Sequence, residues 1–301
     1  MGSIESPNAI ASRHRDGSLG ESVERKVNTM LLLTLLLGTL VGFSLGMTGG
    51  GGAIFAVPLL VYVLRIPTRE AVGISLLTVG STAMVGFIQR ARHGLVEFPT
   101  GILFALAGMI GAPIGSKIAD LIPETILLVA FAFLMLLISV RMWIKAQDSS
   151  AHLPIIADRI DENAGPTCKR DPEGRLRLTS QCSMLLGLVG LGAGVLTGMF
   201  GVGGGFIIVP ALVTFACMGM KRAIGTSLMI ITLVSISGTA SHLLAGKDLS
   251  IQTAAIFTAG SLAGLFIGSW LAQRMAGPTL QRVFAGAILL VAVYVILRSV
   301  Q

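Results

Sequence analysis

Charge is scarce in this sequence. Lys, Arg, Asp and Glu together make up only 12% of the 301 residues, whereas about 25% is usual for a soluble domain. Aromatic residues are also few, at 6%, while apolar residues reach 53% and the mean hydropathy is +0.84. This composition excludes an ordinary soluble globular domain, so we predict an integral membrane protein whose main partner is the lipid bilayer.

Cysteine is scarce as well. The three cysteines, Cys168, Cys182 and Cys217, show no C-x-x-C spacing of the kind that holds a metal or a redox centre. We therefore expect free thiols, no metal site and no cofactor. The net charge of +7 fits basic loops that orient a membrane protein, and no interleaving of basic and aromatic residues indicates a nucleic-acid partner.

Carboxylates are missing from the centres of the apolar segments. Those nearest to the segments all fall at segment ends: Glu70, Glu97, Asp120, Glu124 and Asp248. A central Asp or Glu is the usual site for a proton or a sodium ion inside a membrane. Its absence disfavours a cation as the main substrate.

The apolar residues form ten segments, five in each half of the sequence. They are 30–47, 53–64, 71–89, 99–119, 124–144, 183–197, 205–219, 223–245, 251–272 and 279–297. Most approach the roughly 20 residues that a helix needs to cross a membrane, but the second of each half is short. No segment alternates with period two, so we predict an all-α integral membrane protein.

The number of membrane spans has two solutions. If the short segments are re-entrant, eight full spans remain, and an inside N-terminus splits the 22 Lys and Arg residues 15 to 7 in favour of the cytoplasm, as the positive-inside rule requires. If both short segments cross fully, the chain has ten spans. Five spans in each half, an odd number, would make the two halves inverted repeats. The charge bias favours eight, but long loops obey the rule poorly, and both solutions stay open.

The chain divides into four regions. Residues 1–28 are expected to be a disordered polar tail. The first repeat covers 29–145 and the second covers 182–301. Between them, 146–181 is a polar linker, which is either a solvated connector or a regulatory segment. It carries no catalytic constellation, so we do not expect an enzyme.

Two glycine-rich clusters are the main sign of a duplication. Gly46-Met47-Thr48-Gly49-Gly50-Gly51-Gly52 is followed by Pro58, and Gly198-Met199-Phe200-Gly201-Val202-Gly203-Gly204-Gly205 is followed by Pro210. An offset of 152 residues superposes the two clusters. Broken glycine-rich segments at matching places in two halves are typical of a transporter site near the middle of the membrane.

The chemistry of the clusters favours binding of an anion. Consecutive glycines break a helix, and the short helix that follows begins with amide groups that have no acceptor within the helix. These amides and the positive end of the helix dipole favour an anion. The candidate binding residues are Gly49, Gly50, Gly51 and Gly52 in the first cluster and Gly201, Gly203, Gly204 and Gly205 in the second. The alternative is that the glycines only permit tight helix crossing.

Polar residues at helical spacing follow each cluster. One face carries Ser75, Thr78 and Thr82, and the matching segment carries Thr232, Ser235, Thr239 and His242. The 152 offset relates Ser75 to Ser227 and Arg90 to His242. We take Ser75, Thr78, Ser227, Thr239 and His242 as candidate site residues. His242 is included because its side chain can also carry a proton. Alternatively, the hydroxyls bond their own backbone or a neighbouring helix. Arg90 is expected to snorkel to the interface.

The residues after each cluster carry a family resemblance. Arg69-Glu70-Ala71-Val72-Gly73-Ile74-Ser75 and Lys221-Arg222-Ala223-Ile224-Gly225-Thr226-Ser227, with the glycine clusters before them, resemble the sulfite exporter TauE/SafE family over residues 30–298. The resemblance implies a permease of the cytoplasmic membrane that is associated with sulfite and with organosulfonates such as sulfoacetate.

The residues and the resemblance agree on an anion. The hypothesis is a secondary transporter, an exporter of a small sulfur-containing anion, in which the two breaks line one site and one half rocks against the other. The alternatives are a passive anion channel and a scaffold that acts through the linker. A homo-oligomer is compatible with the sequence.

Overall fold

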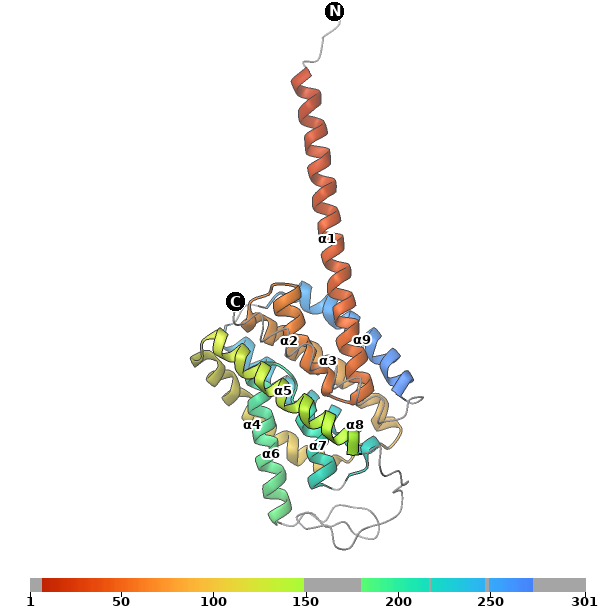
Figure 1. Cartoon of the computed structure of the whole chain (residues 1–301), viewed down its shortest axis with the longest axis vertical. Coiled ribbons are helices and arrows are strands. Elements are labelled where there is room, and N and C mark those ends of the chain that lie inside the picture. The colour runs from red at the N-terminus through yellow and green to blue at the C-terminus, as the bar shows by residue number, and fades with distance from the viewer. Residues whose placement is uncertain (1–6, 149–179, 217, 247–248, 273–301) are drawn as a thin grey trace, which may run out of the picture.

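The computed structural model describes residues 7–148, 180–216, 218–246 and 249–272, and these residues form helices and no strands. The all-α prediction is confirmed for this part of the chain (Figure 1). The elements are α1 (Pro7–Thr48), the 3₁₀ helix η1 (Gly51–Phe55), α2 (Ala56–Pro58), the π-helix η2 (Leu59–Val63), α3 (Thr68–Arg92), α4 (Phe98–Leu121), α5 (Glu124–Asp148), α6 (Ser180–Phe200), α7 (Gly205–Phe215), α8 (Met220–Leu244) and α9 (Ile251–Ala272).

The predicted apolar segments correspond to these elements. Six helices, α1, α3, α4, α6, α8 and α9, are long and apolar enough to cross a membrane, and the two short segments become η1 to η2 and α7. The tenth predicted segment, 279–297, lies outside the described residues, as does most of the predicted linker. The prediction of free thiols is wrong for Cys182, which is in a disulfide bond, since sequence spacing does not show which cysteines meet.

Helix α1 is longer than the sequence suggests. It begins at Pro7, inside the predicted polar tail, and projects beyond the bundle as a single helix (Figure 1). Glu21 and Arg25 have the i, i+4 spacing that supports a helix in water. The prediction of a disordered tail considered only the polarity of this segment and did not use this spacing. The apolar part of α1 begins at Asn28, close to the predicted start of the first repeat.

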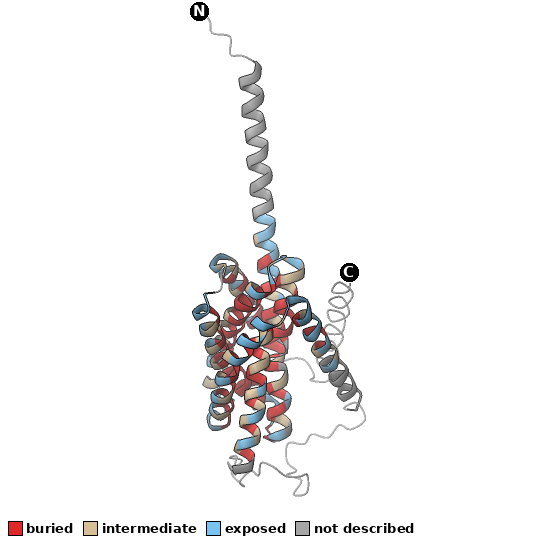
Figure 2. Ribbon diagram, turned by 90° about the vertical axis from the view of Figure 1, so that its left-hand side faces the viewer, coloured by how far each residue is buried: buried red, intermediate tan, exposed pale blue. Residues whose placement is uncertain are grey.

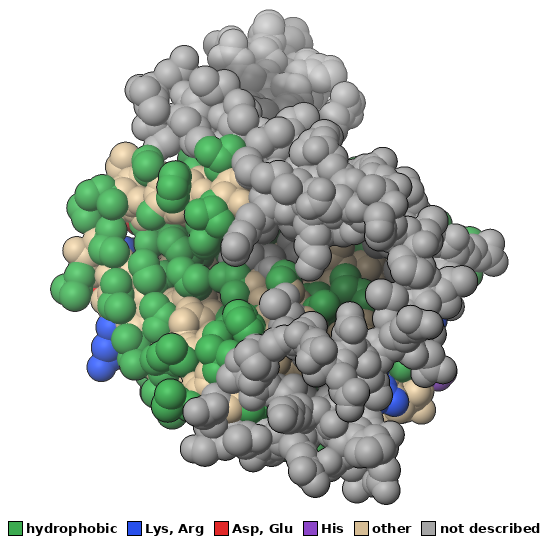
Figure 3. Space-filling view, turned by 60° about the horizontal axis from the view of Figure 1, so that its bottom comes forward, with side chains coloured by type: hydrophobic (Ala, Val, Ile, Leu, Met, Phe, Trp, Pro, Cys, Tyr) green, Lys and Arg blue, Asp and Glu red, His purple; other side chains and the backbone are tan. Residues whose placement is uncertain are grey.

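The outer helices are apolar on both sides, which is the property expected of helices between protein and lipid. In α4 the inward face carries small residues, and the outward face is a stripe of exposed large ones: Ile102, Leu106, Ile110, Ile114 and Ile118. Figure 2 shows buried residues on the inner sides of the helices. Among the described side chains in Figure 3, hydrophobic ones form a broad area on the left of the view, and Lys and Arg lie at the edges.

Helices α3 and α8 form the centre of the bundle. In each of them 67% of the most apolar stretch is buried, against 39–50% in the other four long helices. The two helices run antiparallel, because Gly73 of α3 packs on His242 of α8 while Gly86 packs on Leu228. Residues on α3 and α8 therefore line the interior of the protein.

Glycine stripes join α1 to α9 and α6 to α4. In each stripe the glycines recur every four residues: Gly38, Gly42 and Gly46 on α1, and Gly190, Gly194 and Gly198 on α6. A methyl group on Gly46 would lie 2.5 Å from the carbonyl oxygen of Leu265 on α9, and one on Gly198 would collide with that of Ala112 on α4. The helices touch backbone to backbone, as small-xxx-small patterns permit.

The order of these contacts gives the helix directions. Positions that increase along one helix meet positions that increase along its partner, so α1 runs parallel to α9 and α6 runs parallel to α4. The pairs are Gly38 with Phe257, Gly46 with Leu265, Gly190 with Phe104 and Gly198 with Ala112.

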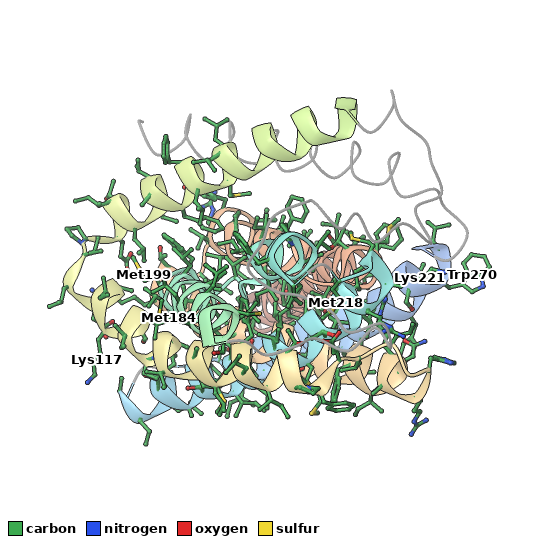
Figure 4. The ribbon with its side chains drawn as sticks, turned by 90° about the horizontal axis from the view of Figure 1, so that it is seen from below. Lys117, Met184, Met199, Met218, Lys221 and Trp270 are labelled. Carbon is green, nitrogen blue, oxygen red and sulfur yellow. The ribbon has the colours of Figure 1, made fainter. Side chains whose placement is uncertain are left out.

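Hydrogen bonds tie the central helices to the same pairs. The bonds are Thr78 Oγ1 with Thr258 Oγ1 at 3.0 Å, Thr82 Oγ1 to Ser261 Oγ at 3.0 Å, Glu97 N to Thr226 Oγ1 at 3.0 Å and Ser237 Oγ to Met109 O at 2.7 Å. The bundle therefore contains two trios of parallel helices. One trio is α1, α3 and α9, the other is α6, α8 and α4, and each takes helices from both halves of the sequence. Lys117 at the end of α4 and Trp270 at the end of α9 point outward at opposite edges (Figure 4).

Two glycines of α6 give a matched test of the close packing. Gly194→Ala places a methyl group against the backbone of Gly108 and is expected to lower stability by about 1–3 kcal/mol through overpacking. Among the described residues, the methyl group of Gly192→Ala meets nothing within 4 Å, so this substitution is expected to leave stability unchanged or raise it by about 0.5–1 kcal/mol. Thermal unfolding of the purified protein in detergent measures both; similar Tm values for the two variants would contradict the packing.

Candidate functional site

Each of the two helix breaks begins with a glycine in the left-handed region. Gly49, directly after α1, has φ 74°, and Gly201, directly after α6, has φ 67°. Their amides still bond to the last turn of the helix, Gly49 N to Leu45 O and Gly201 N to Thr197 O, both at 2.8 Å. A side chain at either position would be strained, so glycine is what allows the helix to end there.

The breaks continue through further glycines into short helical segments. Gly50, Gly203 and Gly204 also have positive φ values, of 155°, 68° and 62°. After the first break the chain runs through Gly51 and Gly52 in η1, then α2 and η2, and after the second it enters α7. Each segment contains the predicted proline, Pro58 or Pro210.

The two breaks meet inside the protein. A methyl group on Gly50 would lie 2.6 Å from the Cα atom of Gly205, and both glycines are buried. The N-terminal ends of the two short segments thus touch, so the positive ends of two helix dipoles point to one buried place. Backbone that carries partial positive charge and no side chains can approach a negatively charged oxygen closely.

Two serines hold the breaks in place from the opposite halves. Ser75 Oγ on α3 donates to the carbonyl oxygen of Gly201 at 2.5 Å, and Ser227 Oγ on α8 donates to that of Gly49 at 2.7 Å. Both serines are fully buried. The 152 offset that relates Ser75 to Ser227 also relates Gly201 to Gly49, so the two bonds are reciprocal.

An apolar side chain lies one turn after each serine. Val79 on α3 follows Ser75, and Ile231 on α8 follows Ser227 at the same offset. A methyl group on Gly203 would lie 2.8 Å from Val79 Cγ1, and one on Gly50 would lie 3.0 Å from Ile231 Cδ1. Both side chains are fully buried, so the breaks are packed against each other and against these two residues. The sequence analysis did not predict Val79 or Ile231 as site residues, although the 152 offset relates the two.

The remaining candidate hydroxyls have other surroundings. Thr78 bonds Thr258 of α9 at 3.0 Å, and Thr232 donates to Leu228 O in its own helix at 2.7 Å. These bonds agree with the alternative that the hydroxyls serve helix packing. Thr239 is half-buried on α8, and the described contacts do not bring it to either break.

His242 and Arg90 lie beside equivalent points of α6 and α1. His242 is 1% exposed and lines a cavity of about 10 Å³ with Gly198 and Met199, large enough for about one water. Arg90 is half-buried and donates to the carbonyl oxygen of Gly46 at 3.3 Å, a partner within the protein that the prediction of snorkelling did not include. A carbonyl at the end of α1, where the helix dipole is negative, is a nearer partner for the cation.

Metal ligation has no support in the described residues. Within them, no group of three or more His, Cys, Asp and Glu side chains could hold a metal ion. The arrangement instead offers backbone groups, hydroxyls and buried apolar side chains.

Comparison with known proteins identifies the family. The family model for "Sulfite exporter TauE/SafE" matches residues 34–295. The chain belongs to the sulfite exporter TauE/SafE family. No solved structure shows significant similarity to it. The matched region of this TauE/SafE protein includes both breaks, both serines and all six long apolar helices except the start of α1.

The similarity between this TauE/SafE protein and its relatives extends over almost the full length of those relatives. A "Probable membrane transporter protein" of Xylella fastidiosa (strain 9a5c) is 34% identical over 273 residues, which cover 89% of this chain and 96% of the relative. "Probable membrane transporter protein YunE" of Bacillus subtilis (strain 168) is 25% identical over 279 residues, 89% of this chain and 98% of the relative. The TauE/SafE chain is therefore a multi-pass membrane protein of a transporter family.

Substitution of the two serines tests the reciprocal bonds of this TauE/SafE protein. Ser75→Ala and Ser227→Ala each leave a buried glycine carbonyl without its donor, which is expected to cost about 1–3 kcal/mol. Ser81→Ala is the control, because the bond of Ser81 among the described residues is to Leu77 O of its own helix. Ser75→Ala and Ser227→Ala should both show a clearly lower Tm than the control. Wild-type Tm values for both would mean that these bonds do not hold the breaks.

Proposed function

We propose that this TauE/SafE protein is a secondary transporter, an exporter of sulfite or a similar organosulfonate anion across the cytoplasmic membrane, with the anion bound between the two glycine breaks. The observation that carries the proposal is the meeting of Gly50 and Gly205, which brings the N-terminal ends of two short helical segments to one buried place. The family description, sulfite exporter, agrees with this substrate class.

The chemistry of the breaks suits a sulfur oxyanion. Sulfite and sulfonates present three oxygens, and amide groups at a helix N-terminus are donors that need no charged side chain. Burial strengthens the attraction between the helix dipoles and an anion, because the surroundings screen it less than water does. In the described spans, the carboxylates Glu70, Asp120 and Glu124 lie in the first or last turn of a helix, where they do not repel an anion at the breaks.

A transporter fits the described interior better than a passive channel. A channel needs a continuous open path, whereas the breaks are packed against Val79 and Ile231. An anion reaches them only after these groups move apart, which is the behaviour of an alternating-access carrier. The scaffold alternative depends on the linker, most of which lies outside the described residues.

The directions of the helices support ten membrane crossings rather than eight. Since α1 and α3 are parallel, the chain between them must return to the end of the bundle where α1 started. Leu64 and Ile66, which follow η2, line a cavity of about 360 Å³ with Met30 of α1 and Thr253 of α9, residues at the starts of those helices. Counting this return as a crossing gives the first half five, so the second half would be its inverted repeat.

In this arrangement the rigid bodies that move during transport are the two trios and not the two sequence halves. Within a trio, glycine stripes hold helices from both halves backbone to backbone, so one half cannot rock against the other without breaking these contacts. The α3–α8 crossing and the breaks are where the trios meet. We propose that alternating access moves one trio against the other along this contact.

A flux experiment tests the transport function. Proteoliposomes with the purified protein should take up labelled sulfite saturably, with competition by sulfonates, and the response to a pH gradient reports on proton coupling. Gly50→Leu and Gly203→Leu should abolish this flux, because the side chain occupies the contact between the breaks. Gly192→Leu is the control, since Gly192 is exposed and a methyl group on it would have no neighbour within 4 Å in the described part of the chain. Undiminished flux in both break variants would remove the breaks from the site.

A labelling experiment tests the inverted repeats. The α3–α4 loop and the α8–α9 loop are related by the 152 offset, and each has a left-handed glycine, Gly94 or Gly246, with φ 66°. Single cysteines at the exposed positions His93 and Ala245, with the native cysteines replaced by serine, should react with a membrane-impermeant thiol reagent from opposite sides of the membrane. Reaction from the same side would favour eight spans and parallel repeats.

A further inference from the structure

One face of α8 connects the breaks to a third position. Ser227, Ile231 and Ser235 follow at i, i+4 and i+8, so they share a face. Ser227 holds the first break and Ile231 packs against both breaks. Ser235 lies one turn further, at the crossing with α3, where a methyl group on Gly80 would be 2.8 Å from Ser235 Cβ and 3.6 Å from its Oγ.

The hydroxyl of Ser235 is buried and has no hydrogen-bond partner in the described part of the protein. The side chain is 1% exposed. The other hydroxyls of the same helix differ: Ser227 bonds Gly49 O, Thr232 bonds Leu228 O and Ser237 bonds Met109 O. A serine in a helix can usually bond the carbonyl four residues back, which would be that of Ile231, but Ser235 does not.

A second serine hydroxyl is in the same condition, and it lies at the first break. Ser44 on α1 is 4% exposed, and its Oγ also has no partner among the described residues. A methyl group on Gly52 would lie 2.6 Å from Ser44 Cβ, so Ser44 packs against the start of η1. Ser44 thus contacts the first break directly, and Ser235 lies one turn from Ile231, which packs against both breaks. The two serines come from different trios.

A buried polar group without a partner is costly. Leaving a hydroxyl unsatisfied inside a protein costs about 1–3 kcal/mol, and such groups in native structures usually have a specific reason, such as a ligand or a bound water. Neither serine is imposed by the repeat, because the 152 offset relates Ser44 to Leu196 and Ser235 to Ala83. Apolar residues are accepted at both equivalent positions, so packing does not require a hydroxyl.

We infer that the hydroxyls of Ser44 and Ser235 are anion ligands of the transport site, an assignment that rests on the proposed function. The amides at the breaks supply the main attraction, and the two hydroxyls donate to oxygens of the anion when Val79 and Ile231 move away. Hydroxyls carry no charge, so they hold the oxyanion without preventing its release. One ligand comes from each trio, so a bound anion would connect the two bodies that move.

The inference predicts opposite effects on substrate binding and on stability. Ser44→Ala and Ser235→Ala should each raise the KM for sulfite in proteoliposomes by about tenfold, the equivalent of about 1.4 kcal/mol, and should reduce the rise in Tm that sulfite causes. Without sulfite their Tm should equal or exceed that of the wild type, because neither substitution removes a hydrogen bond between described residues. Ser237→Ala is the control: it loses the bond to Met109 O, so its Tm should fall while its KM stays unchanged.

The outcomes separate this inference from the proposed function. If the wild type transports sulfite but both alanine variants keep its KM, the ligand assignment is overturned and the function stands. The same holds if the two variants lose stability as Ser237→Ala does, since their hydroxyls would then be structural. If the wild-type protein neither transports nor is stabilised by sulfite or a sulfonate, the proposed function fails and the ligand assignment fails with it.

Discussion

The contact of one helix backbone with another, which glycine permits because it has no side chain, underlies both the packing of this membrane protein and its candidate site. Moving an apolar side chain from lipid into a helix contact gives little free energy, because both surroundings are apolar. Helices in a membrane therefore associate through close packing and hydrogen bonds. The stripes headed by Gly38 and Gly190 supply the packing. The same property at Gly49 and Gly201 ends two helices inside the bundle and allows the segments that follow to meet.

Hydrogen bonds between the halves make the site depend on the whole fold. Ser75 holds the carbonyl of Gly201, and Ser227 holds that of Gly49. Each break is therefore positioned by a helix from the other half. The apolar residues Val79 and Ile231 exclude water from the same place, which keeps the helix dipoles effective. Backbone conformation, serine bonds and apolar packing thus converge on one small region.

The sequence predicts the segments and the breaks better than their relations in space. Hydropathy locates the helices because lipid demands apolar surfaces, and the 152 offset identifies the glycine clusters and the serine pair. Neither signal shows in which direction a helix runs or which helices touch. For example, α4 is apolar on both faces, so hydropathy does not distinguish the face that packs from the face that meets lipid. The spacing of Gly38, Gly42 and Gly46 was an available signal for tight crossing. The partner of Arg90 was not predictable, because it is a backbone carbonyl that appears only when α1 ends nearby.

The exchange of helices between the halves has a consequence for how the protein is made. During synthesis α1 enters the membrane long before its partner α9 is translated, so its glycine stripe first faces lipid. The glycine stripe of α6 is in the reverse position, because α4 is already present when α6 arrives. Insertion can therefore proceed in order, whereas assembly of the first trio waits until α9 has been translated. Neither half contains the partners that it needs to complete its own packing.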